Sequence, residues 1–262
     1  MTRSPMIDAS ALAAGLAEGS LQAVDCRFRL GDPGAGLALF REGHLPGARR
    51  LDLDADLSAP VRADRLGGRH PLPDREAFAA ALRAAGIAGD RAIVLYDDET
   101  GGAARAWWLL RHHGVPSRVL RGGIAAWEGA LEEGDPAPLV GDLQLGGERI
   151  GDHVDADAVR AALAAGRLVL DARAPERYRG EVEPIDPVAG HIDGAINAPF
   201  GAEPPAAALE ATEPPIAYCG SGVSACVLLL RLAEAGRDDA LLYPGSWSDW
   251  CARGLAQPAS AE

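Results

Sequence analysis

The stretch Pro215-Ile-Ala-Tyr-Cys-Gly-Ser-Gly-Val-Ser-Ala-Cys-Val-Leu-Leu-Leu230 joins a short apolar run, a glycine-rich turn and a helical pattern. A short apolar run that ends at a turn predicts a buried strand, and the apolar spacing after the turn predicts a helix. Cys219 is therefore expected at the carboxyl end of a strand, over the first turn of a helix. Backbone N–H groups and the helix dipole favour the thiolate there, which is the nucleophilic form of cysteine.

The same pattern occurs twice along the chain. Two motifs of the first half, Ala23-Val-Asp-Cys-Arg27 and Gly43-His-Leu-Pro-Gly-Ala48, match Val169-Leu-Asp-Ala-Arg173 and Gly190-His-Ile-Asp-Gly-Ala195 of the second. Each copy then has an apolar run that ends in a polar residue followed by glycines, Asp97 in the first half and Cys219 in the second. This internal repeat predicts two similar domains, of which the second carries the thiol.

Each half alternates short apolar strands with helices. Strands are expected near 22–26, 47–52, 92–96 and 117–120, and in the second half near 167–171, 194–198, 215–219 and 239–243. Helices are expected near 9–18, 74–85, 102–113 and 123–130, and in the second half near 155–165, 205–211, 222–235 and 246–252. This alternation predicts an α/β fold in which each domain is a parallel sheet with helices on both faces.

The expected domains cover residues 1–134 and 147–262. A stretch rich in glycine, proline and acidic residues, 129–150, is the expected linker between them. The first copy also carries an additional segment, Asp54 to Arg75, before its third strand. Because Asp97 stands where the second copy has Cys219, we expect the N-terminal domain to be catalytically silent.

The composition limits the classes of partner. The chain has 262 residues, is 48% hydrophobic and carries a formal net charge of −13. Such a charge argues against nucleic acid and anionic membrane surfaces, which need clustered basic residues. The four cysteines lack metal-binding spacing, the N-terminus lacks the apolar core of a signal peptide, and no apolar run approaches a membrane span. These features predict a cytoplasmic protein without a metal.

Three other interpretations of the Cys219 loop compete with the interpretation of Cys219 as a nucleophile. A core cysteine is one, but Gly220 and Gly222 let several N–H groups converge, which packing does not require. Gly220-Ser-Gly-Val-Ser-Ala225 also matches a dinucleotide fingerprint, although such a site usually opens its domain. A phosphatase Cys-x5-Arg loop would need arginine at position 225, where this chain has Ala225.

The motifs, taken together and in this order, resemble the tandem rhodanese-domain sulfurtransferases over nearly the whole chain. This family includes the 3-mercaptopyruvate and thiosulfate sulfurtransferases. The resemblance implies two rhodanese-like domains and a catalytic Cys219 that accepts a sulfur atom as a persulfide, without a cofactor. It also implies a small-molecule sulfur donor, and cyanide, a thiol, or a thioredoxin-like or other protein as the acceptor.

The resemblance assigns further roles in the second domain. The uncharged turn after Cys219 is similar to that of the mercaptopyruvate enzymes, whereas thiosulfate-preferring members carry basic residues there. Ser221 is implied to polarise the donor thiol or carbonyl. Arg177 is implied to bind the anionic group of the donor, with Arg179 as a second candidate. The remaining loop residues are implied to bind the thiolate, the persulfide or the donor: Gly220, Gly222, Val223 and Ser224.

The donor and the class of function stay open at this point. Mercaptopyruvate enzymes tend to carry a second arginine where this chain has the acidic stretch Glu181-Val-Glu-Pro-Ile-Asp-Pro187. Thiosulfate is therefore the alternative donor, with cyanide as its acceptor. An alternative of another class is a non-catalytic persulfide carrier or regulatory module.

The resemblance also implies a relay of His44 and Asp32 with Ser221. The alternative for His44 is a structural role, because the repeat places His191 at the matching position of the second copy. The sequence offers no constellation for His70. Arg173 follows Asp171 at a strand end and is expected to form a structural ion pair.

Overall fold

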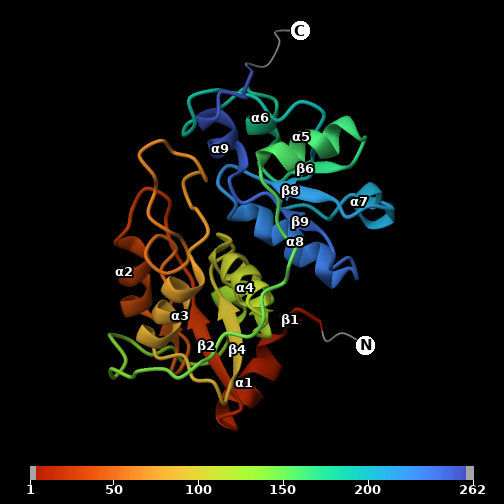
Figure 1. The fold of residues 1–262 in the computed structure, drawn as a ribbon. Coiled ribbons are helices and arrows are strands. Elements are labelled where there is room, and N and C mark those ends of the chain that lie inside the picture. The colour runs from red at the N-terminus through yellow and green to blue at the C-terminus, as the bar shows by residue number, and fades with distance from the viewer. Residues whose placement is uncertain (1–3, 258–262) are drawn as a thin grey trace. The chain divides into compact units, whose positions relative to one another are not determined.

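The computed structural model describes residues 4–257, which form two compact units. The first unit contains residues up to 59 together with 73–149, and the second contains 60–72 together with residues from 150 onward. Each unit has one parallel sheet with helices on both faces, which confirms the predicted fold class (Figure 1). In the described part of the chain, no helix is long and apolar enough to cross a membrane.

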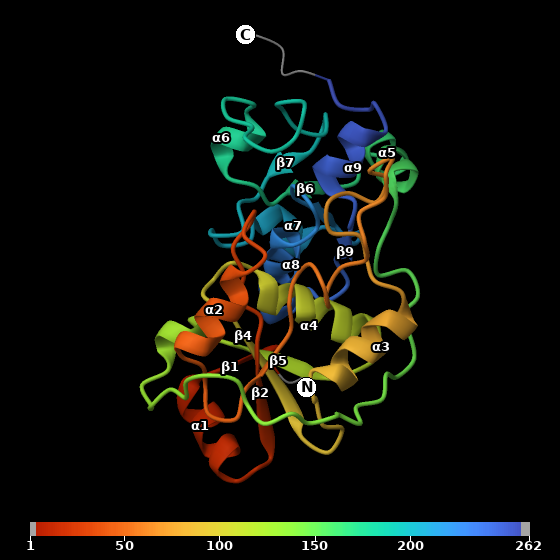
Figure 2. The same cartoon turned by 90° about the vertical axis from the view of Figure 1, so that its left-hand side faces the viewer.

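The sheet of the first unit has five parallel strands. Their order is β1 (Met6–Ile7), β5 (Ser117–Leu120), β4 (Ala92–Tyr96), β2 (Leu21–Asp25) and β3 (Arg49–Arg50). The helices between them are α1 (Ala9–Ala17), α2 (Ala35–Glu42), α3 (Arg75–Ala84) and α4 (Gly102–His112), followed by the 3-10 helix η1 (Gly123–Ala126) (Figure 2).

Strand β4 is buried on both sides, as its apolar sequence predicts. Val94 and Tyr96 join a cluster that includes Leu12 of α1 and Phe40 of α2. The alternate residues of β4 point to the other face of the sheet, where α4 packs against the strand. Burial on both faces stabilises the strand end at which Asp97 follows.

The sheet of the second unit has four parallel strands. Their order is β7 (Ile196–Asn197), β6 (Val169–Asp171), β8 (Ile216–Tyr218) and β9 (Leu241–Leu242). The helices are α5 (Ala156–Ala164), α6 (Pro175–Tyr178), α7 (Ala206–Glu210), α8 (Ser224–Glu234) and α9 (Ser246–Ala252).

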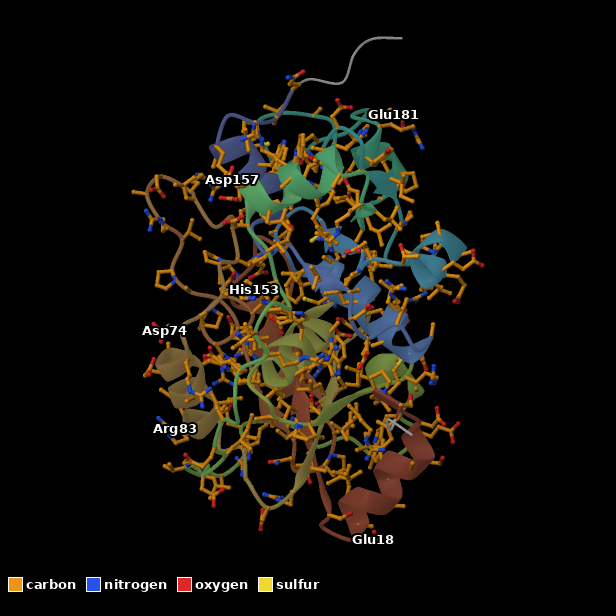
Figure 3. The ribbon with its side chains drawn as sticks, turned by 45° about the vertical axis from the view of Figure 1, so that its right-hand side comes forward. Glu18, Asp74, Arg83, His153, Asp157 and Glu181 are labelled. Atoms are coloured by element: carbon orange, nitrogen blue, oxygen red, sulfur yellow. The ribbon has the colours of Figure 1, made fainter. Side chains whose placement is uncertain are left out.

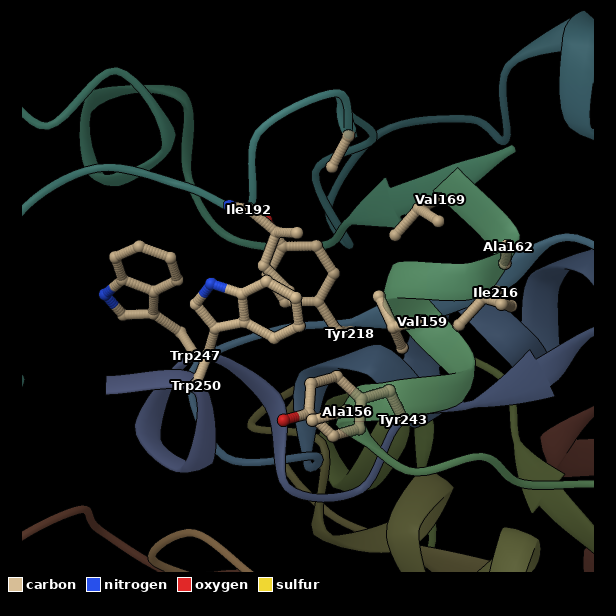
Figure 4. Close-up of a cluster of buried hydrophobic side chains, with 11 residues drawn as sticks. Ala156, Val159, Ala162, Val169, Ile192, Ile216, Tyr218, Tyr243, Trp247 and Trp250 are labelled. Carbon is tan, nitrogen blue, oxygen red and sulfur yellow. The ribbon is translucent and has the colours of Figure 1, made fainter. Parts of the chain in front are cut away.

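The core of the second unit supports strand β8 directly before Cys219. Ile216 and Tyr218 lie in one apolar cluster with Val159 of α5 and with Trp247 and Trp250 of α9 (Figure 4). Trp247 is fully buried and its indole N–H donates to the Val188 carbonyl at 2.9 Å. Burying aromatic side chains of this size contributes strongly to stability, so the end of β8 is held on a rigid base.

Three short elements were not predicted: β1, α2 and α6. Strand β1 is two residues long and pairs only with β5. Helix α2 has eight residues between Gly34 and Gly43, and the glycines and the proline before it weaken a helical pattern. The helix expected over 123–130 is only η1, because the chain becomes extended at Trp127.

Two segments also lie differently from the expected domain division. The expected linker is hydrogen-bonded to the first unit, since Gly141 N–H donates to the Arg83 carbonyl and Gly146 N–H to the His113 carbonyl, both at 2.8 Å. Residues 60–72, from the additional segment of the first copy, pack within the second unit. We call residues 60–72 the strap.

Candidate active site

Cys219 follows β8 and its thiol lies at the start of α8. The sulfur accepts the N–H of Gly222 at 3.1 Å, and Ser246 Oγ lies 4.0 Å from it. Gly222 has a φ of 79°, and a Cβ there would stand 2.4 Å from the carbonyl oxygen of Pro244, so glycine is required. The predicted turn therefore places a backbone donor directly against the sulfur.

The surroundings of Cys219 favour its thiolate. Burial raises the pKa of the thiol, but hydrogen bonds outweigh it, and the pKa lies below its ordinary value. The donors are the hydroxyl of Ser224 and the backbone N–H groups of Ser221, Gly222 and Ala225. These uncharged donors therefore favour the anionic form of the sulfur.

We expect Cys219 to ionise at a lower pH than an ordinary cysteine, whose pKa is about 8.5. Thiolate absorbance, taken as the difference between the wild type and Cys219→Ala, measures this pKa. Ser224→Ala should move the midpoint to higher pH, because it removes one donor to the sulfur. Cys26 and Cys251 do not interfere, since burial raises the pKa of both thiols, that of Cys251 to about 11. A wild-type midpoint at or above the ordinary value would contradict the expectation.

The matching position of the first unit holds a carboxylate. Asp97 follows β4 and accepts the N–H groups of Glu99, Gly101 and Ala103 at 2.9, 2.9 and 3.0 Å. The same strand-to-helix turn thus surrounds a carboxylate in one copy and a thiol in the other. Burial outweighs these N–H groups and raises the pKa of Asp97, whereas in the second copy the hydrogen bonds outweigh burial and lower the pKa of Cys219.

The strap is anchored beside the loop that follows Cys219. Gly67 N–H donates to Asp249 Oδ1 at 2.8 Å. Gly68 has a φ of 82°, and a Cβ on it would lie 2.5 Å from the Gly245 carbonyl oxygen. These two glycines allow the close approach that sets the next two residues of the strap against the loop.

His70 of the strap contacts the loop serine. Its Nδ1 lies 2.8 Å from Ser221 Oγ, and both side chains are buried. The expectation that His70 belongs to no constellation was wrong, because its partner lies 151 residues away in sequence. The only sequence signal was indirect: the additional segment of the first copy contains this histidine.

His44 and Asp32, the residues of the expected relay, have other contacts in the first unit. The His44 ring stacks on Phe40 at 3.9 Å, and its Nδ1 lies 2.8 Å from the Phe40 carbonyl. His191 stacks on Tyr178 in the same way, with Nδ1 2.8 Å from that carbonyl. This equivalence favours the structural role for His44. Asp32 is exposed, and its carboxylate accepts the N–H of Gly34.

Two guanidinium groups lie over Gly220, the residue after Cys219. A Cβ on Gly220 would stand 2.9 Å from Arg69 Nη2 and 3.3 Å from Arg177 Nη1. Arg177 therefore lies beside the loop after Cys219, and its anion-binding role stays a prediction. Arg69 was not among the residues predicted for the site. The structure thus brings together Cys219, Ser221, Arg177 and the turn glycines.

Two buried carboxylates orient these arginines. Glu183 accepts Arg177 Nη2 at 2.7 and 2.9 Å, and Asp186 accepts Arg69 Nη1 and lies 3.5 Å from Arg177 Nη2. Burial raises the pKa of Glu183, but backbone N–H groups and Arg177 outweigh it and lower the pKa overall. The acidic stretch 181–187 therefore supplies the counter-charges for the arginines.

Two further residues predicted for the site are Arg179, which follows α6, and Val223, which precedes α8. Arg179 is more than half exposed and pairs at 2.6 Å with Glu181, which Figure 3 labels at the surface of the second unit. Both Nε and Nη2 of its guanidinium donate to that carboxylate. Val223 is buried at the N-cap position of α8.

One cluster of possible metal ligands lies within the first unit. His112, His113 and Glu148 offer ligand atoms within 4.8 Å of one another. Arg75 Nη1 lies 3.5 Å from His113 Nδ1 and 3.9 Å from Glu148, however, and its positive charge opposes a cation there.

A model of the rhodanese-like domain matches the chain twice, over residues 8–130 and 155–253. The chain belongs to the tandem rhodanese-domain sulfurtransferases. Members of this family are enzymes. The two matched regions correspond to the two structural repeats of the chain. The additional strap lies inside the first match in sequence but inside the second unit in space.

Relatives and solved structures support this assignment along the whole chain. A probable 3-mercaptopyruvate sulfurtransferase of Pseudomonas aeruginosa is 46% identical, over 95% of this chain and 96% of the relative. A Mycobacterium tuberculosis protein, provisionally named a thiosulfate sulfurtransferase, is 41% identical over 94% of this chain and 93% of its own length. The crystal structure of the Escherichia coli 3-mercaptopyruvate sulfotransferase SseA superposes with a TM-score of 0.78, at 32% identity, over 94% of this chain and all of that one.

Proposed function

We propose that this sulfurtransferase takes sulfur from 3-mercaptopyruvate, carries it as a persulfide on Cys219, and passes it to cyanide, a thiol or a thioredoxin-like protein. The observation that carries the choice of donor is the contact between His70 Nδ1 and Ser221 Oγ beside Cys219. A thiol donor needs a proton moved during the reaction, and a histidine–serine pair can move one. Thiosulfate, the alternative donor, has no proton to move.

The first step forms an S–S bond and breaks the S–C bond of the donor. The Cys219 thiolate attacks the donor sulfur, and the electron pair of the S–C bond becomes the enolate of pyruvate. The thiol proton leaves the sulfur and ends on the methyl carbon of pyruvate, which leaves a persulfide anion on Cys219. In this proposal Ser221 and His70, which contact each other, carry that proton and polarise the donor carbonyl. The backbone N–H groups around Cys219 stabilise the anion before and after the step.

The second step returns the enzyme to its starting state. The acceptor, for example cyanide, attacks the outer sulfur of the persulfide. The S–S bond breaks, its electron pair stays on Cys219 as the thiolate, and thiocyanate leaves. The two steps balance without a cofactor or a metal. A reducing compartment such as the cytoplasm keeps Cys219 from being trapped in a disulfide, and this is the location we propose.

Steady-state kinetics with the two donors test this proposal. The specificity constant for 3-mercaptopyruvate is expected to exceed that for thiosulfate. His70→Gln should lower kcat with mercaptopyruvate by about a hundredfold or more, because general acid–base catalysis contributes on that order. The same variant should change kcat with thiosulfate much less, since that donor transfers no proton.

His44→Gln is the matched control, since His44 is also a buried histidine but contacts Phe40. It should leave the ratio of the two donor rates unchanged. A larger wild-type specificity constant for thiosulfate would identify that donor instead. Slow turnover with every donor, despite sulfur loading of Cys219, would favour the carrier or regulatory alternative.

A further inference from the structure

The strap supplies more than His70 to the loop after Cys219. Arg69 is the residue before His70, and the two lie against consecutive residues of the loop: Arg69 over Gly220 and His70 against Ser221. Two adjacent residues of the strap thus lie against two adjacent residues of the loop. A histidine can exchange a proton with the reacting thiol of a sulfur donor, and a guanidinium can bind an anionic group at the other end of that donor.

The nitrogens of the two arginines that lie nearest Gly220 donate to no protein group in the described part of the chain. Asp186 accepts Nη1 of Arg69, and Glu183 and Asp186 accept Nη2 of Arg177. Nη2 of Arg69 and Nη1 of Arg177 are the nitrogens that approach Gly220. Nε of both side chains is buried without a hydrogen-bond partner. Buried guanidinium donors without partners are costly, so these groups are suited to a ligand that completes their hydrogen bonds.

The ligand that fits this arrangement is small and anionic. Each of the two free nitrogens lies within 3.3 Å of one point over Gly220, so a single carboxylate placed above that point can accept from both. The buried carboxylates of Glu183 and Asp186 keep the guanidinium groups from turning away.

We propose that Arg69 is a donor-binding residue, and that it completes with Arg177 a two-arginine clamp for the carboxylate of the sulfur donor. The acidic stretch 181–187 has no arginine, and the strap provides the second guanidinium from elsewhere in the sequence. This inference rests on the proposed function and assigns the carboxylate end of the donor to Arg69, while Ser221 and His70 face its thiol and carbonyl.

Kinetics of Arg69→Met with two related donors test the clamp. The donors are 3-mercaptopyruvate and 1-mercapto-2-propanone, which has the same thiol and ketone but no carboxylate. Arg69→Met should raise KM for mercaptopyruvate about tenfold to a hundredfold, the usual effect of one hydrogen bond to a charged group, and leave kcat nearly unchanged. It should leave kcat/KM for the neutral donor unchanged. Inhibition by pyruvate, which keeps the carboxylate, should weaken to a similar extent.

Arg62→Met is the control, because Arg62 lies on the same strap but is exposed and pairs with Asp64. It should behave as wild type with both donors. An equal loss of kcat/KM with both donors in Arg69→Met would mean that Arg69 only positions the strap. An unchanged kcat/KM for mercaptopyruvate would mean that Arg69 does not bind the donor. Either result overturns the inference. A wild type that does not use mercaptopyruvate would instead contradict the proposed function, and this inference with it.

Discussion

Replacing Cys219 with serine is expected to abolish sulfur transfer. Serine keeps the size of the side chain and its place at the end of β8, but its hydroxyl is not ionised near neutral pH and does not form a persulfide. Loss of the nucleophile from an enzyme of this kind lowers kcat on the order of a millionfold, because the covalent intermediate no longer forms. Turnover of 3-mercaptopyruvate, followed by pyruvate release, measures the loss.

Cys251→Ser serves as the control for this substitution. Cys251 lies on α9 of the same unit and is partly exposed, but burial and the nearby Asp186 raise its pKa to about 11. Its thiol is therefore protonated under assay conditions, and its replacement should leave kcat nearly unchanged. Turnover by Cys219→Ser at a rate close to wild type would disprove covalent catalysis by Cys219.

Arg173→Met is expected to destabilise the second unit by about 3–5 kcal/mol, the usual cost of removing one partner of a buried ion pair. Arg173 donates to both carboxylate oxygens of Asp171, at 2.7–3.1 Å, and to the Gly190 carbonyl at 2.7 Å. Its guanidinium also lies 5.0 Å from the centre of the Trp247 ring. Without it, Asp171 is a buried charge with no counter-charge. Hydrogen exchange of backbone amides, read separately for each unit, measures the change.

The repeat provides a matched control for Arg173. Arg27 pairs with Asp25 and donates to the Gly43 carbonyl at 2.7 Å, in the same geometry within the first unit. Arg27→Met should therefore lower protection of the first unit rather than the second. The double variant Asp171→Asn with Arg173→Met should lose less stability than Arg173→Met alone, because it leaves no buried charge. Unchanged protection in Arg173→Met would show that the pair contributes nothing.

These pairs explain why the sequence was informative about the fold. In each copy the arginine joins the aspartate that ends a strand, β2 or β6, to the glycine before the histidine that both copies carry, so both motifs recur together. The strands β4 and β8 are apolar because they are buried on both faces, and their ends placed Asp97 and Cys219 correctly. Such features are local, or repeat within the chain, and a sequence pattern records them.

The polar partners of the active site were harder to predict. His70 and Arg69 reach the loop after Cys219 through a strap that folds with the other repeat, and nothing in their own neighbourhood indicates that contact. His44, by contrast, lies in a repeated motif, and the repetition marks a structural role shared with His191. Arg179 is close to Arg177 in sequence, but the turn of α6 directs it to Glu181 at the surface.

The Asp97 cradle sharpens the interpretation of Cys219. Three backbone N–H groups bind the carboxylate of Asp97 in the first unit, and the equivalent turn of the second unit lowers the pKa of a thiol. Both copies thus direct backbone N–H groups at the side chain that follows the strand, and only the second copy has a nucleophilic sulfur atom there. The persulfide anion would occupy the same cradle after transfer.

The central claim is that 3-mercaptopyruvate leaves its sulfur on Cys219. The intact mass of the enzyme, recorded after brief treatment with this donor in the absence of an acceptor, tests the claim most directly. We predict a gain of one sulfur atom in the wild type, its removal by cyanide, and no gain in Cys219→Ser. An unchanged wild-type mass, or the same gain in Cys219→Ser, would contradict the account.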